Sequence, residues 1–211
     1  MAIFADDMAL IALGGNLHGR WGAPERTLAR AMRQLADSQT VHPVRLSRLW
    51  RSAPYGGLRQ PAFVNAVALV RTSLSPHALL KLLAAVERAA GRRRGVAWGA
   101  RTLDLDLIDH AGRIVRPCGA GRLGGAGAQH RLQRKGLILP HPGLRHRVFV
   151  LLPLAEVRPD WRHPVTGETM AGLLAQLPAA RASCRPLRAQ PEEWAGLRSH
   201  FQHHGDFRLT R

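Results

Sequence analysis

The part of the sequence with the clearest capacity for chemistry is the run 98–106, WGARTLDLD. Its second half alternates leucine with Asp104 and Asp106, the pattern of a strand with one apolar and one acidic face. Two carboxylates at this spacing lie on the same face, roughly 7 Å apart along the backbone. Hard cations such as Mg²⁺ take such oxygen ligands, often together with phosphates. The alternative is a strand face whose aspartates are merely solvated. Aspartate is a poor strand former, so two on one face argue for a function. The pair alone leaves a metal site and a solvated face about equally favoured.

Arginines close to this pair favour the functional interpretation. Arg101 lies within the run, and Arg92–Arg94 come shortly before it. Cations beside a metal-binding carboxylate pair indicate a shared polyanion, most simply a phosphate. His141 stands between two prolines and is soon followed by Arg147, which also suits an anion site.

Hydrophobic periodicity predicts the elements that must position these residues. Strands are expected at 8–13, 44–50, 63–70 and 103–107, and amphipathic helices at 24–36 and 75–90. Their β-α-β-β-α-β order is that of a ferredoxin-like α+β fold, with an antiparallel sheet, both helices on one face and the other face free for a ligand. Glu87 falls near the end of the second helix, where the dipole disfavours an acid. It therefore indicates either an outside partner or a salt bridge to Arg88 or Arg92.

Two further features lie around the third strand. The connection 51–61 is long for a compact domain, which favours a functional loop. Asn65 lies in an otherwise apolar run, so it must have a partner. The sequence favours neither a structural hydrogen bond nor a ligand contact as the role of Asn65.

The later part of the chain is less regular. Residues 116–136 are rich in glycine and arginine and predict a flexible insertion. Residues 148–154 pack again, and a short helix is expected at 170–177. We therefore expect one domain over residues 1–180 and a basic C-terminal appendage over 181–211, whose role the sequence does not indicate.

Composition bounds the class of protein. The 211 residues carry a formal charge of +17, nearly all of it from arginine. Nucleic acid, an anionic membrane and a phosphorylated ligand all fit this charge. Two cysteines make no disulfide framework, the apolar runs are too short to cross a bilayer, and the acidic start lacks the basic region of a signal peptide. A soluble cytoplasmic protein is the expectation.

Taken together, these motifs resemble the 6-hydroxymethyl-7,8-dihydropterin pyrophosphokinase family over roughly residues 9–164. The most specific part is the run 98–106, which resembles the family signature. The supporting motifs are LGGNL at 13–17, WRSAPYGG at 50–57, QPAFVNAV at 60–67, Glu87 with GRRR at 91–94, LPH at 139–141 and RVF at 147–149.

The resemblance implies a ferredoxin-like enzyme that transfers pyrophosphate from ATP to the hydroxymethyl group of a reduced pterin and releases AMP. It implies that Asp104 and Asp106 hold two Mg²⁺ ions. It assigns Arg92 and Arg101 to charge neutralisation, and His141 and Arg147 to ATP and the leaving phosphate. Glu87, Arg94 and Trp98 fall at nucleotide- or pterin-adjacent positions.

The resemblance also implies a pterin site. Asn65 is expected to hydrogen-bond the pterin edge, and Phe63 and Phe149 to sandwich its ring. The loop of Ser52, Ala53 and Tyr55 is expected to give backbone contacts, with Trp98 nearby. A flat heteroaromatic ligand requires such aromatic faces and a few fixed polar groups.

The sequence departs from the family pattern at several positions. Ala100 replaces a usual proline before the signature arginine, Ala53 replaces another in the pterin loop, and Gly15 replaces a usual serine. These changes leave two alternatives, a related enzyme for a modified pterin and a non-catalytic basic relative that binds nucleic acid. The expected partners are ATP and a reduced pterin, with no membrane. Few aromatics interleave with the basic run, which disfavours nucleic acid, although the charge permits it. Both a monomer and a homodimer remain open.

Overall fold

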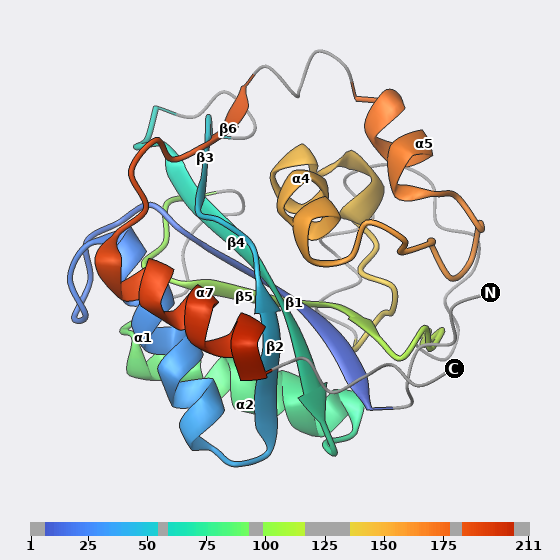
Figure 1. Ribbon diagram of the computed structural model, residues 1–211, viewed down its shortest axis with the longest axis horizontal. Coiled ribbons are helices and arrows are strands. Elements are labelled where there is room, and N and C mark those ends of the chain that lie inside the picture. Colours follow the sequence, from blue (N-terminus) through green and yellow to red (C-terminus); the bar gives the residue numbers. More distant parts are fainter. Residues whose placement is uncertain (1–6, 55–58, 93–98, 117–135, 178–182, 205–211) are drawn as a thin grey trace.

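The computed structural model describes residues 7–54, 59–92, 99–116, 136–177 and 183–204 (Figure 1). The predicted β-α-β-β-α-β order is confirmed. The core elements are β1 (Met8–Gly15), α1 (Pro24–Asp37), β2 (Val41–Leu46), β3 (Trp50–Ser52), β4 (Phe63–Thr72), α2 (Pro76–Ala89) and β5 (Asp104–His110).

The sheet is antiparallel, as predicted. Its order is β5-β1-β4-β3-β6, where β6 (Cys184–Pro186) comes from the C-terminal part of the chain, and β2 also pairs with β4. The strand expected at 44–50 is two strands, because Ser47 interrupts the pairing. The Ser47 N–H donates to Val67 O at 2.9 Å, and its hydroxyl accepts from the Val67 N–H at 3.0 Å. The Ser47 hydroxyl thus accepts the hydrogen bond from Val67 that a backbone carbonyl would accept in an uninterrupted strand.

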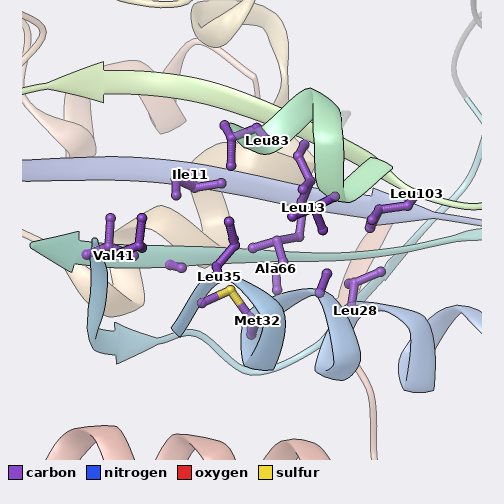
Figure 2. Packing of buried hydrophobic residues seen from close by; sticks show 14 of the residues in the cluster. Ile11, Leu13, Leu28, Met32, Leu35, Val41, Ala66, Leu83 and Leu103 are labelled. Carbon is purple, nitrogen blue, oxygen red and sulfur yellow. The ribbon is translucent and has the colours of Figure 1, made fainter. Parts of the chain in front are cut away.

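Helices α1 and α2 pack on one face of the sheet, as expected. Their apolar stripes meet the alternate residues of β1, represented by Ile11 and Leu13 of the strand, Met32 of α1 and Leu83 of α2 (Figure 2). Proline stands in the first turn of each helix, where its missing N–H costs nothing. The Ser75 hydroxyl caps α2 by accepting from the Ala78 N–H at 3.3 Å.

The sequence predicted that the sheet face opposite α1 and α2 is free for a ligand. In the structure this face is partly covered. Helix α4 (Val148–Val157) and the predicted short helix α5 (Met170–Ala175) lie on this side of the sheet (Figure 1). Helix α4 is apolar around its circumference, so it buries one side against β1 and β4 and the other under α5. A 3₁₀ turn, η2 (Leu144–His146), leads into α4 and fixes its start near the end of β5.

The described part of the segment expected to form a C-terminal appendage, residues 183–204, packs onto the domain. Strand β6 extends the sheet beside β3, and α7 (Glu192–His204) packs against β2 and α1. Trp194 of α7 is fully buried in the same cluster as α1 and α2. Across the described ranges, no helix has the length and apolar character to cross a membrane.

Candidate active site

A pocket opens where the ends of three strands meet the start of α4. The register brings Gly14 of β1 opposite Asn65 of β4 on one side and opposite Asp104 of β5 on the other. The cavity measures about 660 Å³, which includes space open to solvent. Its wall contains many of the predicted site residues, namely Ser52, Ala53, Phe63, Asn65, Arg101, Asp104, Asp106, Arg147 and Phe149.

One end of the pocket holds the two aspartates, each paired with cations. Asp104 accepts from Arg92 Nη1 at 2.7 Å and from Arg101 Nη1 at 2.8 Å. Asp106 accepts from Arg147 Nη1 at 2.8 Å, and His141 Nε2 lies 3.8 Å from the same oxygen. The fold therefore brings two basic residues from near the aspartates in the sequence, Arg92 and Arg101, together with the distant pair His141 and Arg147.

Glu87 reaches the same cluster from α2. Its Oε1 accepts from the Leu105 N–H at 2.7 Å and forms an ion pair with Arg92. The salt bridge to Arg92, one of the two explanations offered by the sequence, is thus present. Burial raises the pKa of Glu87 to about 7, although the charge of Arg92 opposes the rise.

The two aspartates have opposite electrostatic environments. Burial, with the charge of Asp106, raises the pKa of Asp104 against the opposing effect of Arg101. Burial would also raise the pKa of Asp106, but the contacts with His141 and Arg147 outweigh it and lower that pKa. Burial lowers the pKa of His141 to about 4, so its imidazole is neutral at pH 7.

The donor set fits a hard divalent cation shared with a phosphate. Asp104 and Asp106 supply hard oxygens from one face of β5, and both line the pocket. Groups of three or more His, Cys, Asp or Glu side chains arranged for a metal are absent from the described ranges. Mg²⁺ is commonly held by one or two carboxylates, with substrate phosphates and waters completing its shell. An aspartate pair at an open pocket therefore suits it.

The other end of the pocket is aromatic and polar. Phe63 of β4 and Phe149 of α4 both line it. Asn65 Nδ2 donates to Ser52 Oγ at 3.0 Å and lies 3.5 Å from Trp50 O. Asn65 thus makes the structural hydrogen bond that was one of the two alternatives. It also lines the cavity, and its contact with a ligand stays a prediction.

Asn16 is a structural residue of the site that the sequence indicated only as part of the LGGNL motif at 13–17. Its Oδ1 accepts from the Arg101 N–H at 2.9 Å, and its Nδ2 donates to Pro61 O at 2.9 Å. Asn16 therefore ties the end of β1 to both walls of the pocket. A Cβ at the preceding Gly15 would lie 2.6 Å from Thr102 O, which explains the glycine. The signal was the Gly-Gly-Asn turn directly after a buried strand.

Three predicted site residues, Tyr55, Arg94 and Trp98, lie outside the described residues, as does most of the insertion predicted at 116–136. The remaining predicted residues all lie at the pocket or in the charged cluster beside it.

Comparison with known proteins gives a consistent result. Residues 10–159 match the family model of 7,8-dihydro-6-hydroxymethylpterin-pyrophosphokinase. A 2-amino-4-hydroxy-6-hydroxymethyldihydropteridine pyrophosphokinase from Synechocystis is 37% identical over 80% of this chain and 75% of its own length. Enzymes with the same name from Methylorubrum extorquens and Haemophilus influenzae are 34% and 36% identical, over 80% and 72% of this chain and 92% and 82% of their own lengths.

Solved structures support the fold. Plasmodium falciparum HPPK-DHPS with pterin and p-hydroxybenzoate matches with a TM-score of 0.62 at 13% identity, over 87% of this chain. The wild-type form with SDX-DHP matches with a TM-score of 0.57 at 14% identity, over 81%. This chain spans 48% and 43% of those two proteins. At such low identity the likeness concerns the fold alone, which is the ferredoxin-like fold predicted from the sequence.

Proposed function

The chain belongs to the 7,8-dihydro-6-hydroxymethylpterin-pyrophosphokinase family, and we propose from this membership that it transfers pyrophosphate from ATP to the hydroxymethyl group of 6-hydroxymethyl-7,8-dihydropterin, a step of folate biosynthesis. The observation that carries the proposal is the division of the pocket. Carboxylates and arginines gather at one end, and two phenylalanines with an amide line the other. These are the groups that a polyphosphate and a flat heteroaromatic ring require.

The reaction joins the two substrates within the pocket. The hydroxymethyl oxygen of the pterin forms a bond to the β-phosphorus of ATP, the bond from that phosphorus to the oxygen of the α-phosphate breaks, and AMP leaves. The hydroxyl proton passes to solvent. Such transfers need in-line positioning and charge neutralisation more than covalent help.

The charged end of the pocket is suited to the triphosphate. Asp104 and Asp106 would hold Mg²⁺, which when bound supplies positive charge at the phosphate oxygens. Arg92, Arg101 and Arg147 form ion pairs with carboxylates in the free protein. When ATP arrives, these arginines can turn to its phosphates, because guanidinium forks bind phosphate as they bind carboxylate.

The apolar end is suited to the pterin. Phe63 and Phe149 offer aromatic surface to the ring, and Asn65, held by Ser52, offers a fixed amide to its polar edge. Ala53 lines the same end in place of the proline usual in the family pattern. This smaller side chain favours, as a second candidate, a pterin with a modified substituent.

The experiment that tests the function is an AMP-release assay with Mg-ATP and the unmodified pterin. Asp106→Ala should lower turnover by about 100-fold or more, because it removes a carboxylate that would hold the Mg²⁺ at the phosphates. Asp37→Ala, at an exposed carboxylate of α1, is the matched control and should retain wild-type turnover.

Circular dichroism should show that both variants are folded. Near-wild-type turnover of Asp106→Ala would exclude the proposed metal role. Absence of AMP release from the wild-type chain with this pterin would exclude the first candidate, and release with only a substituted pterin would select the second.

A further inference from the structure

The strand that borders the apolar end of the pocket is interrupted, and the interruption is buried. β2 ends at Leu46 and β3 begins at Trp50. Ser47 and Leu49, which lie between them, are fully buried. Since Ser47 takes up the ladder positions of Val67 with its own N–H and hydroxyl, the neighbouring backbone groups must find partners elsewhere.

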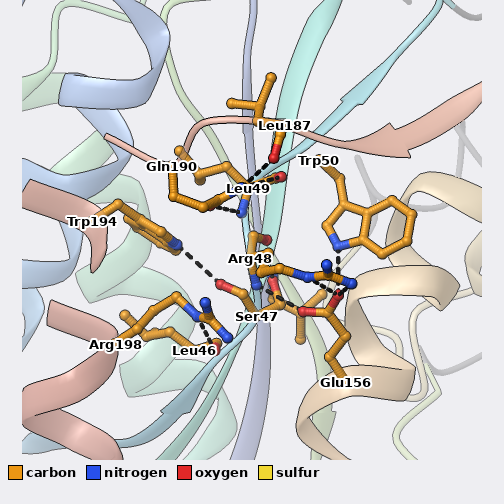
Figure 3. A network of polar contacts seen from close by, with 11 residues as sticks. Leu46, Ser47, Arg48, Leu49, Trp50, Glu156, Leu187, Gln190, Trp194 and Arg198 are labelled. Carbon is orange, nitrogen blue, oxygen red and sulfur yellow. Dashed lines mark hydrogen bonds and ion pairs between the residues drawn. The ribbon is translucent and has the colours of Figure 1, made fainter. Parts of the chain in front are cut away.

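The C-terminal segment supplies partners for these groups (Figure 3). Gln190 bonds both backbone groups of Leu49: its Oε1 accepts from the N–H at 2.7 Å, and its Nε2 donates to the carbonyl at 3.2 Å. The indole N–H of Trp194 donates to Ser47 O at 3.0 Å. An amide that matches one residue's donor and acceptor together replaces the missing strand neighbour.

Further hydrogen bonds surround the interruption on two sides. On the side of α7, Arg198 Nε donates to Leu46 O at 3.1 Å. On the side of α4, Glu156 accepts from the Arg48 N–H at 2.8 Å and from Trp50 Nε1 at 3.2 Å. The bend between β2 and β3 is therefore held from both faces of the sheet.

Strand β3, which follows the interruption, carries part of the pocket wall. The Ser52 hydroxyl accepts from Asn65 Nδ2 at 3.0 Å, and Ala53 follows directly. The Ala53 N–H donates to Ser183 O at 3.2 Å, beside β6. Because β3 is so short, its position depends on the contacts at its two ends and on β4 and β6 beside it.

We propose that Gln190 and Trp194 are positioning residues for the pterin end of the pocket. They hold the bend so that Ser52 and Ala53 keep their places beside Asn65. Both residues are outside the set of described residues that line the cavity, so they act through β3. The charged cluster is built from other segments, namely the end of α2 and the residue Arg92 after it, Arg101 with β5, and the start of α4. We therefore expect it to be less sensitive to this bend than the pterin end. The inference rests on the proposed function, which places the pterin at this end.

Two variants remove the hydrogen bonds while keeping most of the side-chain volume. Gln190→Met removes the paired amide, and Trp194→Phe removes the indole N–H. Phe201→Leu is the matched control for lost packing, because Phe201 lies in the same helix and core cluster as Trp194 and its side chain cannot hydrogen-bond to the bend. The pterin dissociation constant should rise about fivefold in the first two variants, and the KM for ATP should stay within about twofold of the wild type.

Amide hydrogen exchange is the second measurement. The Ala53 N–H should exchange faster in Gln190→Met and Trp194→Phe than in Phe201→Leu at equal distance below each melting temperature. Unchanged pterin affinity and unchanged exchange in both variants would overturn the proposal, and so would an equal rise in the control. Failure of the wild type to release AMP would reject the proposed function instead, and the exchange comparison would still decide the positioning role.

Discussion

Asp104 and Asp106 differ in their electrostatic surroundings although they lie two residues apart on one strand. Asp104 is shared between Arg92 and Arg101, but burial and its neighbouring carboxylate raise its pKa. For Asp106, the contacts with His141 and Arg147 overcome burial and lower its pKa. Charge balance in the free protein therefore comes from arginines that can also bind phosphate.

A third aspartate of the same strand serves as a contrast. Asp109 is fully buried, and its Oδ2 accepts from the indole N–H of Trp161 at 3.0 Å. Burial raises its pKa, and the bond from Trp161 only reduces the rise. A raised pKa in the folded state means that the folded protein disfavours the ionised form. The charge therefore costs stability at pH values above the ionisation of an unfolded aspartate, near pH 4.

We predict that Asp109→Asn raises the free energy of unfolding at pH 7.5, because asparagine can still accept from Trp161 without a charge. The gain over the wild type should shrink as the pH falls through the folded-state pKa and vanish below about pH 4, where the wild-type carboxyl becomes protonated in the unfolded state as well. Urea unfolding at several pH values measures the difference, with Asp37→Asn at an exposed site as the control. A gain that does not vary with pH would contradict this electrostatic account.

At the scale of elements, the segment after β5 is organised by pairing across the insertion. Val115 and Leu139 exchange two backbone hydrogen bonds of 3.0 Å, and the His141 N–H donates to Ile108 O at 2.9 Å. The residues on either side of the insertion therefore hold His141 at the site through these bonds. The residues between the flanks are therefore not needed to position His141.

We predict that a Gly-Ser linker of about six residues can replace residues 117–135, because the cost of closing a loop changes slowly with its length. AMP release should stay within about twofold of the full chain, and the melting temperature within a few degrees. A variant in which alanine replaces His141 is the comparison that should lose activity. A large loss from the linker exchange alone would assign the inserted residues a part in the reaction.

At the scale of the whole molecule, the charge of +17 exceeds what the candidate site uses. The arginines at the site are paired with Glu87, Asp104 and Asp106, so the excess of positive charge lies elsewhere on the chain. Such a surface attracts polyanions without selecting among them, and salt weakens that attraction. The same surface also draws ATP toward the pocket.

We predict that single-stranded RNA binds this protein only at low salt and with a steep dependence on salt concentration. At an ionic strength of about 0.15 M, where charges are screened beyond about 8 Å, RNA should leave AMP release unchanged. Filter binding and the AMP assay across a salt series measure both effects. Tight binding that persists at this salt concentration would support the alternative of a nucleic-acid-binding relative.

The sequence by itself determined the features that depend on near neighbours along the chain. Alternation placed Asp104 and Asp106 on one face of a strand, and the helical spacing of apolar residues located α1 and α2. The order of these elements then predicted the antiparallel sheet, because few arrangements bury all their apolar faces. The motifs also predicted Phe63 and Asn65 as pocket residues.

Only the tertiary structure decided the features that depend on distant partners. The break at Ser47 arises because its hydroxyl pairs with Val67, which no local pattern encodes. The run 148–157 is apolar in every direction and gives no period, so only its packing under α5 shows it to be a helix on the ligand face. Likewise, the polar C-terminal segment has no visible periodicity, yet Gln190 and Trp194 complete buried hydrogen bonds more than a hundred residues away in sequence. The sequence identified Asp104, Asp106 and their basic neighbours as site residues, but only the fold decided which cation pairs with which aspartate, because His141 and Arg147 reach the pair from a distant segment.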